Sequence, residues 1–177
     1  GEPGTGKSTI AKIVAESLFE IGAIPQNKFT TATSDEFVKG YVGQTGENTR
    51  KILDAALGGV LFIDEADTFL SRRLPSSNEN SKHYNSMSNE LYTLIENFNG
   101  CIVFASNHIK DFDPAVISRI IEPIEFKLPN DDARKLIISK MLPKNAPIEL
   151  SETDFSELVT VTKGFSGRDI RKAMLIF

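Results

Sequence analysis

This sequence has little cysteine, no net positive charge and no long apolar run. Its one cysteine, Cys101, has no partner for a disulfide within the chain, which suits the cytoplasm. The formal net charge of -4 gives no overall basic field that would attract nucleic acid. No apolar run approaches the roughly 18 residues that a membrane span requires, and no secretory signal is recognisable. We therefore expect a cytoplasmic globular protein with no membrane contact, and nucleic acid is disfavoured as its partner.

Helical and strand-like patterns alternate over the first two thirds of the chain. Five apolar residues at helical spacing predict a helix over residues 7–21 with one apolar face: Ile10, Ile13, Val14, Leu18 and Ile21. Short strands are expected over residues 28–33, 60–63, 102–105 and 124–126, and a second helix around residues 52–57. Unbroken apolar runs such as residues 60–63 are typical of parallel strands covered by helices on both faces.

The pattern changes near residue 129. Pro129, Asn130, Asp131 and Asp132 resemble a linker and a helix cap, and three amphipathic helices are expected beyond them without another strand. Strands that alternate with helices and then give way to helices predict a three-layer α/β/α sandwich with a small helical lid. We place the α/β part at residues 1–129 and the lid at residues 130–177.

The first eight residues fit a phosphate-binding pattern, in which two glycines with four residues between them are followed by Lys and Ser at the start of a helix. Backbone N–H groups of such a loop surround phosphate oxygens, Lys7 neutralises phosphate charge, and Ser8 offers its hydroxyl to Mg²⁺. The alternative is a Gly-rich turn that only caps a helix. The predicted nucleotide contacts are Glu2, Pro3, Gly4, Thr5, Gly6, Lys7, Ser8 and Thr9.

Two acids end the apolar run of residues 60–63. In open parallel sheets ligands bind beyond the carboxyl ends of the strands, so Asp64 is expected beside the phosphate loop, where it holds the water shell of Mg²⁺. Glu65 is then placed to orient and deprotonate the water that attacks the γ-phosphate, which favours a hydrolase over a kinase. A strand that simply ends in solvated acids is the alternative. The sequence therefore predicts an ATPase with ATP and Mg²⁺ as its ligands.

At this point the sequence resembles the AAA+ ATPases, a family of P-loop NTPases with a parallel sheet, over nearly its whole length. Residues 104–107 look like the sensor-1 strand, which implies that Asn107 positions the attacking water. Residues 112–119 resemble the segment of the arginine finger, which implies that Arg119 reaches the nucleotide of a neighbouring subunit. Residues 164–171 are similar to the sensor-2 helix of the lid, with Arg168 facing the γ-phosphate and Arg171 as the alternative.

Residues 38–43 look like the central-pore loop of protein-threading members, which implies that Tyr41 and Val42 grip the substrate. An exposed aromatic residue between glycines can stack on any extended peptide, although a loop Tyr buried in the local core is the alternative. Residues 41–45 and 58–66 most resemble the group that includes red-type Rubisco activases. From the resemblance we expect the first sheet strand of the family to be missing from this chain, the lid to be cut short, and the isolated chain to be an incomplete ATPase.

Three functions fit this resemblance to different degrees. The favoured one is a homo-oligomeric ring, a hexamer, in which ATP hydrolysis drives remodelling or threading of a protein substrate. A motor or loader that acts on nucleic acid is the second, although Lys39 alone gives a pore little positive charge for tracking phosphates. A scaffold that uses nucleotide only for assembly is the third, and Glu65 argues against it because a scaffold needs no water-activating base. The substrate and any adaptor are not identified by the sequence.

Overall fold

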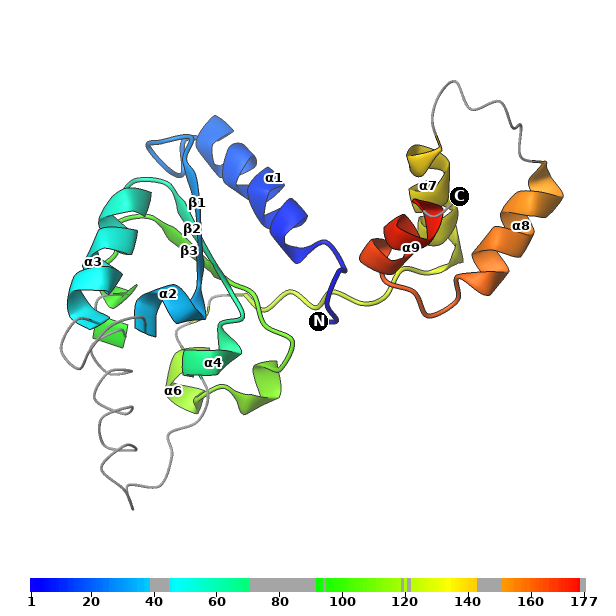
Figure 1. Cartoon of the computed structure of the whole chain (residues 1–177). Helices are drawn as coiled ribbons and strands as arrows, with labels where there is room; N and C mark the ends of the chain where they lie inside the picture. The colour runs from blue at the N-terminus through cyan, green and yellow to red at the C-terminus, as the bar shows by residue number, and fades with distance from the viewer. Residues whose placement is uncertain are drawn as a thin grey trace, which may run out of the picture. The chain divides into compact units, whose positions relative to one another are not determined.

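Three parallel strands form the sheet of the described residues, in the order β1-β2-β3 (Figure 1). Their bounds are Phe29–Thr33 for β1, Val60–Asp64 for β2 and Cys101–Phe104 for β3. The register pairs Thr33 with Asp64 and Ile63 with Phe104, so the three strands end at one edge of the sheet. The polar residues that follow these strands therefore gather at that edge.

The computed structural model describes residues 1–38, 45–70, 92–93, 95–118, 120, 122–142 and 151–175. Packing divides the chain into two units, of which one joins Gly1–Lys7 to Ile124–Phe177 and the other is Ser8–Pro123. The boundary predicted between residues 129 and 130 stays a prediction. No described helix is both long enough and apolar enough to cross a membrane.

In the unit Ser8–Pro123, helices cover both faces of the sheet, as Figure 1 shows, which confirms the three-layer α/β/α prediction. Leu61 and Ile63 of β2 point to one face, where they join a core cluster with residues of α2 and α3. Val60 and Phe62 point to the other face, against α1. The helices of this unit are α1 (Lys7–Glu20), α2 (Ser34–Val38), α3 (Thr45–Ala56), α4 (Asp67–Leu70), η1 (Ile109–Asp111) and α6 (Pro114–Ile117).

Helix α1 packs on the sheet with a face that its sequence pattern did not indicate. Ala11 and Ala15, one turn apart, are its buried residues and belong to core clusters with Phe62 and Val60 respectively. The predicted apolar face is instead largely exposed, at 41% for Ile10, 52% for Ile13, 38% for Val14 and 75% for Ile21, and Leu18 is partly buried. The small alanine side chains let the helix backbone approach the strands closely, which larger side chains at the same positions would prevent.

One predicted strand is wrong. Residues 124–126 form neither a strand nor a ladder pairing in the structure. The apolar pattern Ile124-Glu125-Phe126 meets the local requirement of a strand, but a strand also needs a neighbour to accept its hydrogen bonds. Phe126 instead presents its carbonyl oxygen to Gly1, so closely that a Cβ atom at Gly1 would clash with it.

The lid consists of α7 (Asp131–Met141), α8 (Glu152–Val161) and α9 (Gly167–Met174), which confirms the three predicted helices. The predicted cap is also confirmed, because the Asn130 side chain accepts a hydrogen bond of 2.9 Å from the N–H of Ala133. Arg134 of α7, with only 4% of its surface exposed, joins the helices. Its guanidinium donates to the carbonyl oxygens of Pro129 and Val159, and to the carboxylate of Asp131.

We expect Arg134→Ala to lower the free energy of unfolding of the lid by about 2–4 kcal/mol, because it removes the guanidinium that donates to the partly buried carbonyl oxygens of Pro129 and Val159. Arg134→Lys should recover only part of this loss, since an ammonium group lacks the planar fork that reaches several acceptors. Hydrogen exchange at the amides of α7 and α8 measures the change directly.

Lys135 supplies the control for this prediction. It forms an exposed pair with Glu152 at 2.8 Å, and such pairs contribute about 0–1 kcal/mol. Lys135→Ala should therefore change exchange far less than Arg134→Ala. Equal effects of the two substitutions would show that the buried guanidinium does not organise the lid.

Candidate functional site

The phosphate loop Gly1–Lys7 curls around the ammonium group of its own lysine. Lys7 Nζ donates to the carbonyl oxygen of Gly1 at 2.7 Å and to that of Glu2 at 3.0 Å, and the Thr5 hydroxyl donates to the same Glu2 oxygen at 2.8 Å. Gly4 and Gly6 have φ angles of +75° and +94°, which side chains of L-residues rarely allow. The loop thus concentrates positive charge inside a tight backbone turn, a feature that suits a phosphate ligand.

Ser8 and Asp64 line one cavity of about 270 Å³ in the unit Ser8–Pro123. Ser8 lies in the first turn of α1 and Asp64 at the carboxyl end of β2, and both are exposed. The remaining lining residues are Thr31, Ala32, Thr33, Glu36 and Phe62. A helix that starts beside the end of a buried strand therefore brings the predicted hydroxyl and carboxylate to the same space.

The oxygen atoms of this cavity fit a hydrated Mg²⁺ ion. Mg²⁺ prefers oxygen donors, keeps several of its waters, and is usually bound through one or two carboxylates together with phosphate oxygens. The hydroxyl of Ser8 and the carboxylate of Asp64 match that donor set. Over the described ranges no group of three or more His, Cys, Asp and Glu residues is placed to hold a metal, so a closed protein cage is not what these residues form.

Glu65 has the one left-handed backbone among the described non-glycine residues, with φ at +53°. Its own N–H donates to Asp64 Oδ1 at 3.0 Å. Ala105, the residue after β3, holds both sides of this turn, because its N–H donates to Ile63 at 2.8 Å and its carbonyl accepts from Ala66 at 2.9 Å. These bonds hold a conformation that costs a non-glycine residue roughly 1–2 kcal/mol.

Asn107 follows β3 at the same edge of the sheet and is exposed. The residue before it, Ser106, accepts a hydrogen bond of 2.8 Å from the N–H of His108, which turns the chain at this point. Because β2 and β3 are neighbours in register, Asp64 at the end of β2 and Glu65 and Asn107 just beyond β2 and β3 lie at adjacent strand ends. This is the edge at which parallel sheets bind ligands.

A model of the family described as "ATPase family associated with various cellular activities (AAA)" matches residues 1–128. This chain belongs to the AAA family. The expected AAA ATPase domain is confirmed, whereas the finer resemblance to red-type Rubisco activases stays a prediction.

Three curated relatives illustrate the range of AAA proteins that are similar to this chain. A protein of Methanocaldococcus jannaschii named as a 26S proteasome regulatory subunit homologue is 34% identical, with 99% of this chain and 46% of that protein covered. A CfxQ homologue of Trieres chinensis is 33% identical over 85% of this chain and 52% of that protein. The ESX-1 secretion system protein EccA1 of Mycolicibacterium smegmatis is 49% identical over 41% of this chain and 13% of that protein.

The chain thus spans about half the length of the relatives that it matches over most of its own length. Among solved structures, the FIGL-1 AAA domain in complex with ADP superposes with a TM-score of 0.76 at 22% identity, covering 99% of this chain and 57% of that one. This likeness shows that the AAA fold is shared.

Further residues were predicted for the AAA site. Arg119, Tyr41 and Val42 fall outside the described residues. Arg168, in the first turn of α9, donates its backbone N–H to the carbonyl oxygen of Gly4 at 3.2 Å, while Arg171 is exposed on the same helix. The choice between the two arginines as the sensor-2 residue stays a prediction.

Glu36 also lines the cavity, although it was not predicted as a site residue. Its Oε2 accepts hydrogen bonds from the N–H of Thr33 at 2.7 Å and from the Thr33 hydroxyl at 3.3 Å. This arrangement is half of a capping box, and the spacing of Thr33 and Glu36, three residues apart at the start of a helix, was a signal for it. The carboxylate of Glu36 thereby fixes Thr33, the last residue of β1, which pairs with Asp64 in the strand register.

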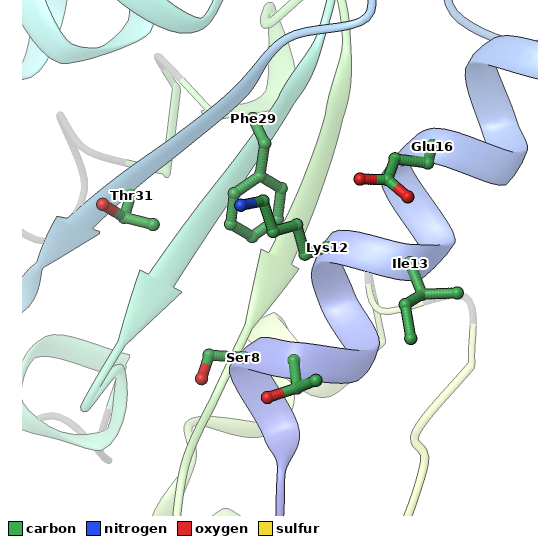
Figure 2. Close-up of a pocket in the computed structure, with 7 residues that line it drawn as sticks. Ser8, Lys12, Ile13, Glu16, Phe29 and Thr31 are labelled. Atoms are coloured by element: carbon green, nitrogen blue, oxygen red, sulfur yellow. The ribbon is translucent and has the colours of Figure 1, made fainter. Parts of the chain in front are cut away.

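A second cavity, of about 530 Å³, shares Ser8 and Thr31 with the first. Figure 2 shows it between α1 and β1, with Lys12, Ile13 and Glu16 on the helix and Phe29 on the strand. The Phe29 ring stacks on Phe62, a residue of the first cavity, with centroids 5.9 Å apart. Each cavity is therefore lined by one ring of this stacked pair.

The backbone of Glu65 generates a prediction about stability. Since both Glu65→Gly and Glu65→Ala remove the carboxylate, they differ mainly in how well they tolerate a positive φ. We expect Glu65→Gly to unfold with a free energy about 1 kcal/mol higher than Glu65→Ala, as measured by urea denaturation.

Glu16, an exposed residue within α1, provides the matched control. Gly within a helix lowers the free energy of unfolding by about 1 kcal/mol relative to Ala. The Glu16→Gly protein should therefore be less stable than the Glu16→Ala protein. The order of the two substitutions should therefore invert between positions 16 and 65. The same order at both positions would mean that Glu65 is not held in the left-handed region.

Proposed function

We propose that this AAA chain binds ATP with Mg²⁺ and hydrolyses it to ADP and phosphate. The observation that carries the proposal is the shared cavity of Ser8 and Asp64, next to a Glu65 whose backbone conformation is held against its local preference. Backbone of this kind is concentrated at functional sites, where the surrounding structure maintains the strain. An Mg²⁺ ion there would neutralise charge on the β- and γ-phosphate oxygens.

The residues of this chain divide the reaction between them. Lys7 neutralises phosphate charge within the loop Glu2–Lys7, and Ser8 and Asp64 hold the hydrated Mg²⁺. Glu65 accepts a proton from water as the water oxygen forms a bond to the γ-phosphorus, and the bond to the bridging oxygen of ADP breaks. Asn107, from the adjacent strand end, orients this water. The carboxylate is thereby protonated and releases its proton to solvent before the next turnover.

The subunit arrangement and the substrate belong to the same proposal. AAA proteins typically form rings, so we propose a homo-oligomer, a hexamer, in which Arg119 reaches the nucleotide of a neighbouring subunit and Arg168 responds to the γ-phosphate. The work of this cytoplasmic motor is remodelling or threading of protein substrates by Tyr41 and Val42. Relatives named as proteasome regulatory subunit homologues support a protein substrate.

The catalytic assignment predicts two different defects. Glu65→Gln should bind ATP as the parent does but hydrolyse it about 10²-fold or more slowly, the usual scale for loss of a general base. Lys7→Ala should instead lose tight ATP binding, because it removes the positive side chain inside the loop. Equilibrium binding and single-turnover hydrolysis, measured on the intact protein, separate the two. Near-parental turnover by Glu65→Gln would place the base elsewhere.

The substrate class predicts which polymer stimulates the ATPase. We expect an unfolded polypeptide to raise the steady-state rate of the intact oligomer, and Tyr41→Ala to lose this stimulation while it retains basal hydrolysis, since Ala offers little area to grip a chain. Single-stranded DNA at low and moderate salt is the comparison. DNA stimulation that falls steeply with salt, without a response to polypeptide, would indicate a nucleic-acid motor.

A further inference from the structure

The lid begins two of its helices with the same side-chain arrangement. At α8, Asp154 accepts from the backbone N–H and the hydroxyl of Ser151 at 2.8 and 2.6 Å. At α9, Asp169 accepts from the same two groups of Ser166 at 3.1 and 2.7 Å. In both boxes the serine hydroxyl oxygen also accepts from the backbone N–H of the aspartate, at 3.2 and 3.3 Å. The two boxes therefore share the same three hydrogen bonds, although the Ser151 hydroxyl is also hydrogen-bonded to that of Thr153 at 2.7 Å.

Among the described hydrogen bonds and close approaches, only those of the box at α9 reach the phosphate loop. The N–H of Arg168 donates to the carbonyl oxygen of Gly4 at 3.2 Å. A Cβ atom at Gly4 would lie 2.7 Å from Ser166 Oγ and 2.6 Å from Arg168 Cβ, so the loop backbone rests directly on the start of α9. Ser166 is buried, with 4% of its surface exposed, and all these residues belong to one packing unit.

The hydrogen bonds of Asp169 determine the position of the atoms against which Gly4 packs. They fix the rotamer of Ser166, and with it the position of the hydroxyl oxygen against which Gly4 packs. They also keep the first turn of α9 intact, which directs the N–H of Arg168 toward Gly4. The hydrogen bonds from Ser166 lower the pKa of the Asp169 carboxyl, so the box is fully formed at neutral pH.

We propose that Asp169 is a positioning residue for the phosphate loop: through Ser166 it fixes the surface on which Gly4 rests, and so holds residues 1–7 in the shape that receives nucleotide phosphates. The last step rests on the proposed binding of ATP by this loop. Without the box the loop samples other shapes, and the apparent nucleotide affinity falls in proportion to the population of the competent one.

The test compares Asp169→Ala with Asp154→Ala in the intact protein. Both substitutions remove a capping box from the lid, so both should loosen their own helix to a similar extent. Loss of a cap changes a local equilibrium by about 3- to 30-fold. We expect Asp169→Ala to raise the dissociation constant for ADP by about 3- to 30-fold. Asp154→Ala should leave this constant within about twofold of the parental value. Asp169→Glu keeps a carboxylate at this position, and Glu is the common acid of capping boxes, so this variant should bind ADP with the parental affinity.

Hydrogen exchange in the nucleotide-free protein keeps this inference separate from the ATPase proposal. Amides of residues 1–7 should exchange faster in Asp169→Ala by a factor in the same range, and at the parental rate in Asp154→Ala. If the loop responds in this way but the parent binds no nucleotide, the positioning role stands and the ATPase proposal fails. Equal loop exchange in the two variants, or equal ADP affinities, would overturn the positioning role.

A variant that loses α9 altogether would show complete exchange at residues 167–174. In that case Asp169→Asn, which keeps one acceptor oxygen, replaces Asp169→Ala in both measurements, with Asp154→Asn as its control. Faster loop exchange in Asp169→Asn alone supports the proposal, and equal exchange in the two asparagine variants contradicts it.

Discussion

The turn that follows β2 depends on hydrogen bonds from the neighbouring strand. Glu65 lies between Ile63 and Ala66, both of which are bonded to Ala105 beyond the end of β3. A residue with a side chain gains nothing locally from a left-handed backbone, so the energy that holds it there must come from these bonds and from the packing of β2 and β3. The position of the candidate general base therefore depends on the pairing of β2 and β3. This pairing fixes the backbone of Glu65, and the backbone in turn sets where the exposed carboxylate begins.

The same dependence on neighbours applies to the phosphate loop. Its lysine is held by carbonyl oxygens of the loop itself, while Gly4 is held by the start of α9, a helix more than 160 residues later in the chain. The absence of a side chain at Gly4 therefore serves two purposes. It permits the positive φ of the loop, and it leaves room for Ser166 and Arg168 to approach. The lid in turn is held by Arg134, whose fork connects the start of α7 to the end of α8.

Sequence patterns predicted the parts of this protein whose chemistry is local. The phosphate loop, the acid pair and the first cap of the lid each need particular residue types at fixed spacing, and Asn130 caps its helix as its position indicates. Apolar patterns also indicated the helices α1 and α3, the three strands and the three helices of the lid, but not the short helices α2, α4 and α6. Glu36 was within reach of the same reasoning, because its spacing from Thr33 marks a helix start, but only the cavity connects it with Ser8 and Asp64.

By itself, the sequence determined the chemical groups and the type of each element, because backbone preferences and motif spacing act over a few residues. The tertiary structure decided which groups meet. It selected Ala11 and Ala15 as the packed face of α1, since the distance between helix and sheet favours small side chains over the larger Ile10 and Ile13. It left residues 124–126 without a ladder, and it placed the backbone of Glu65 in the left-handed region. Each of these outcomes depends on contacts between distant segments, and local pattern carries no information about such contacts.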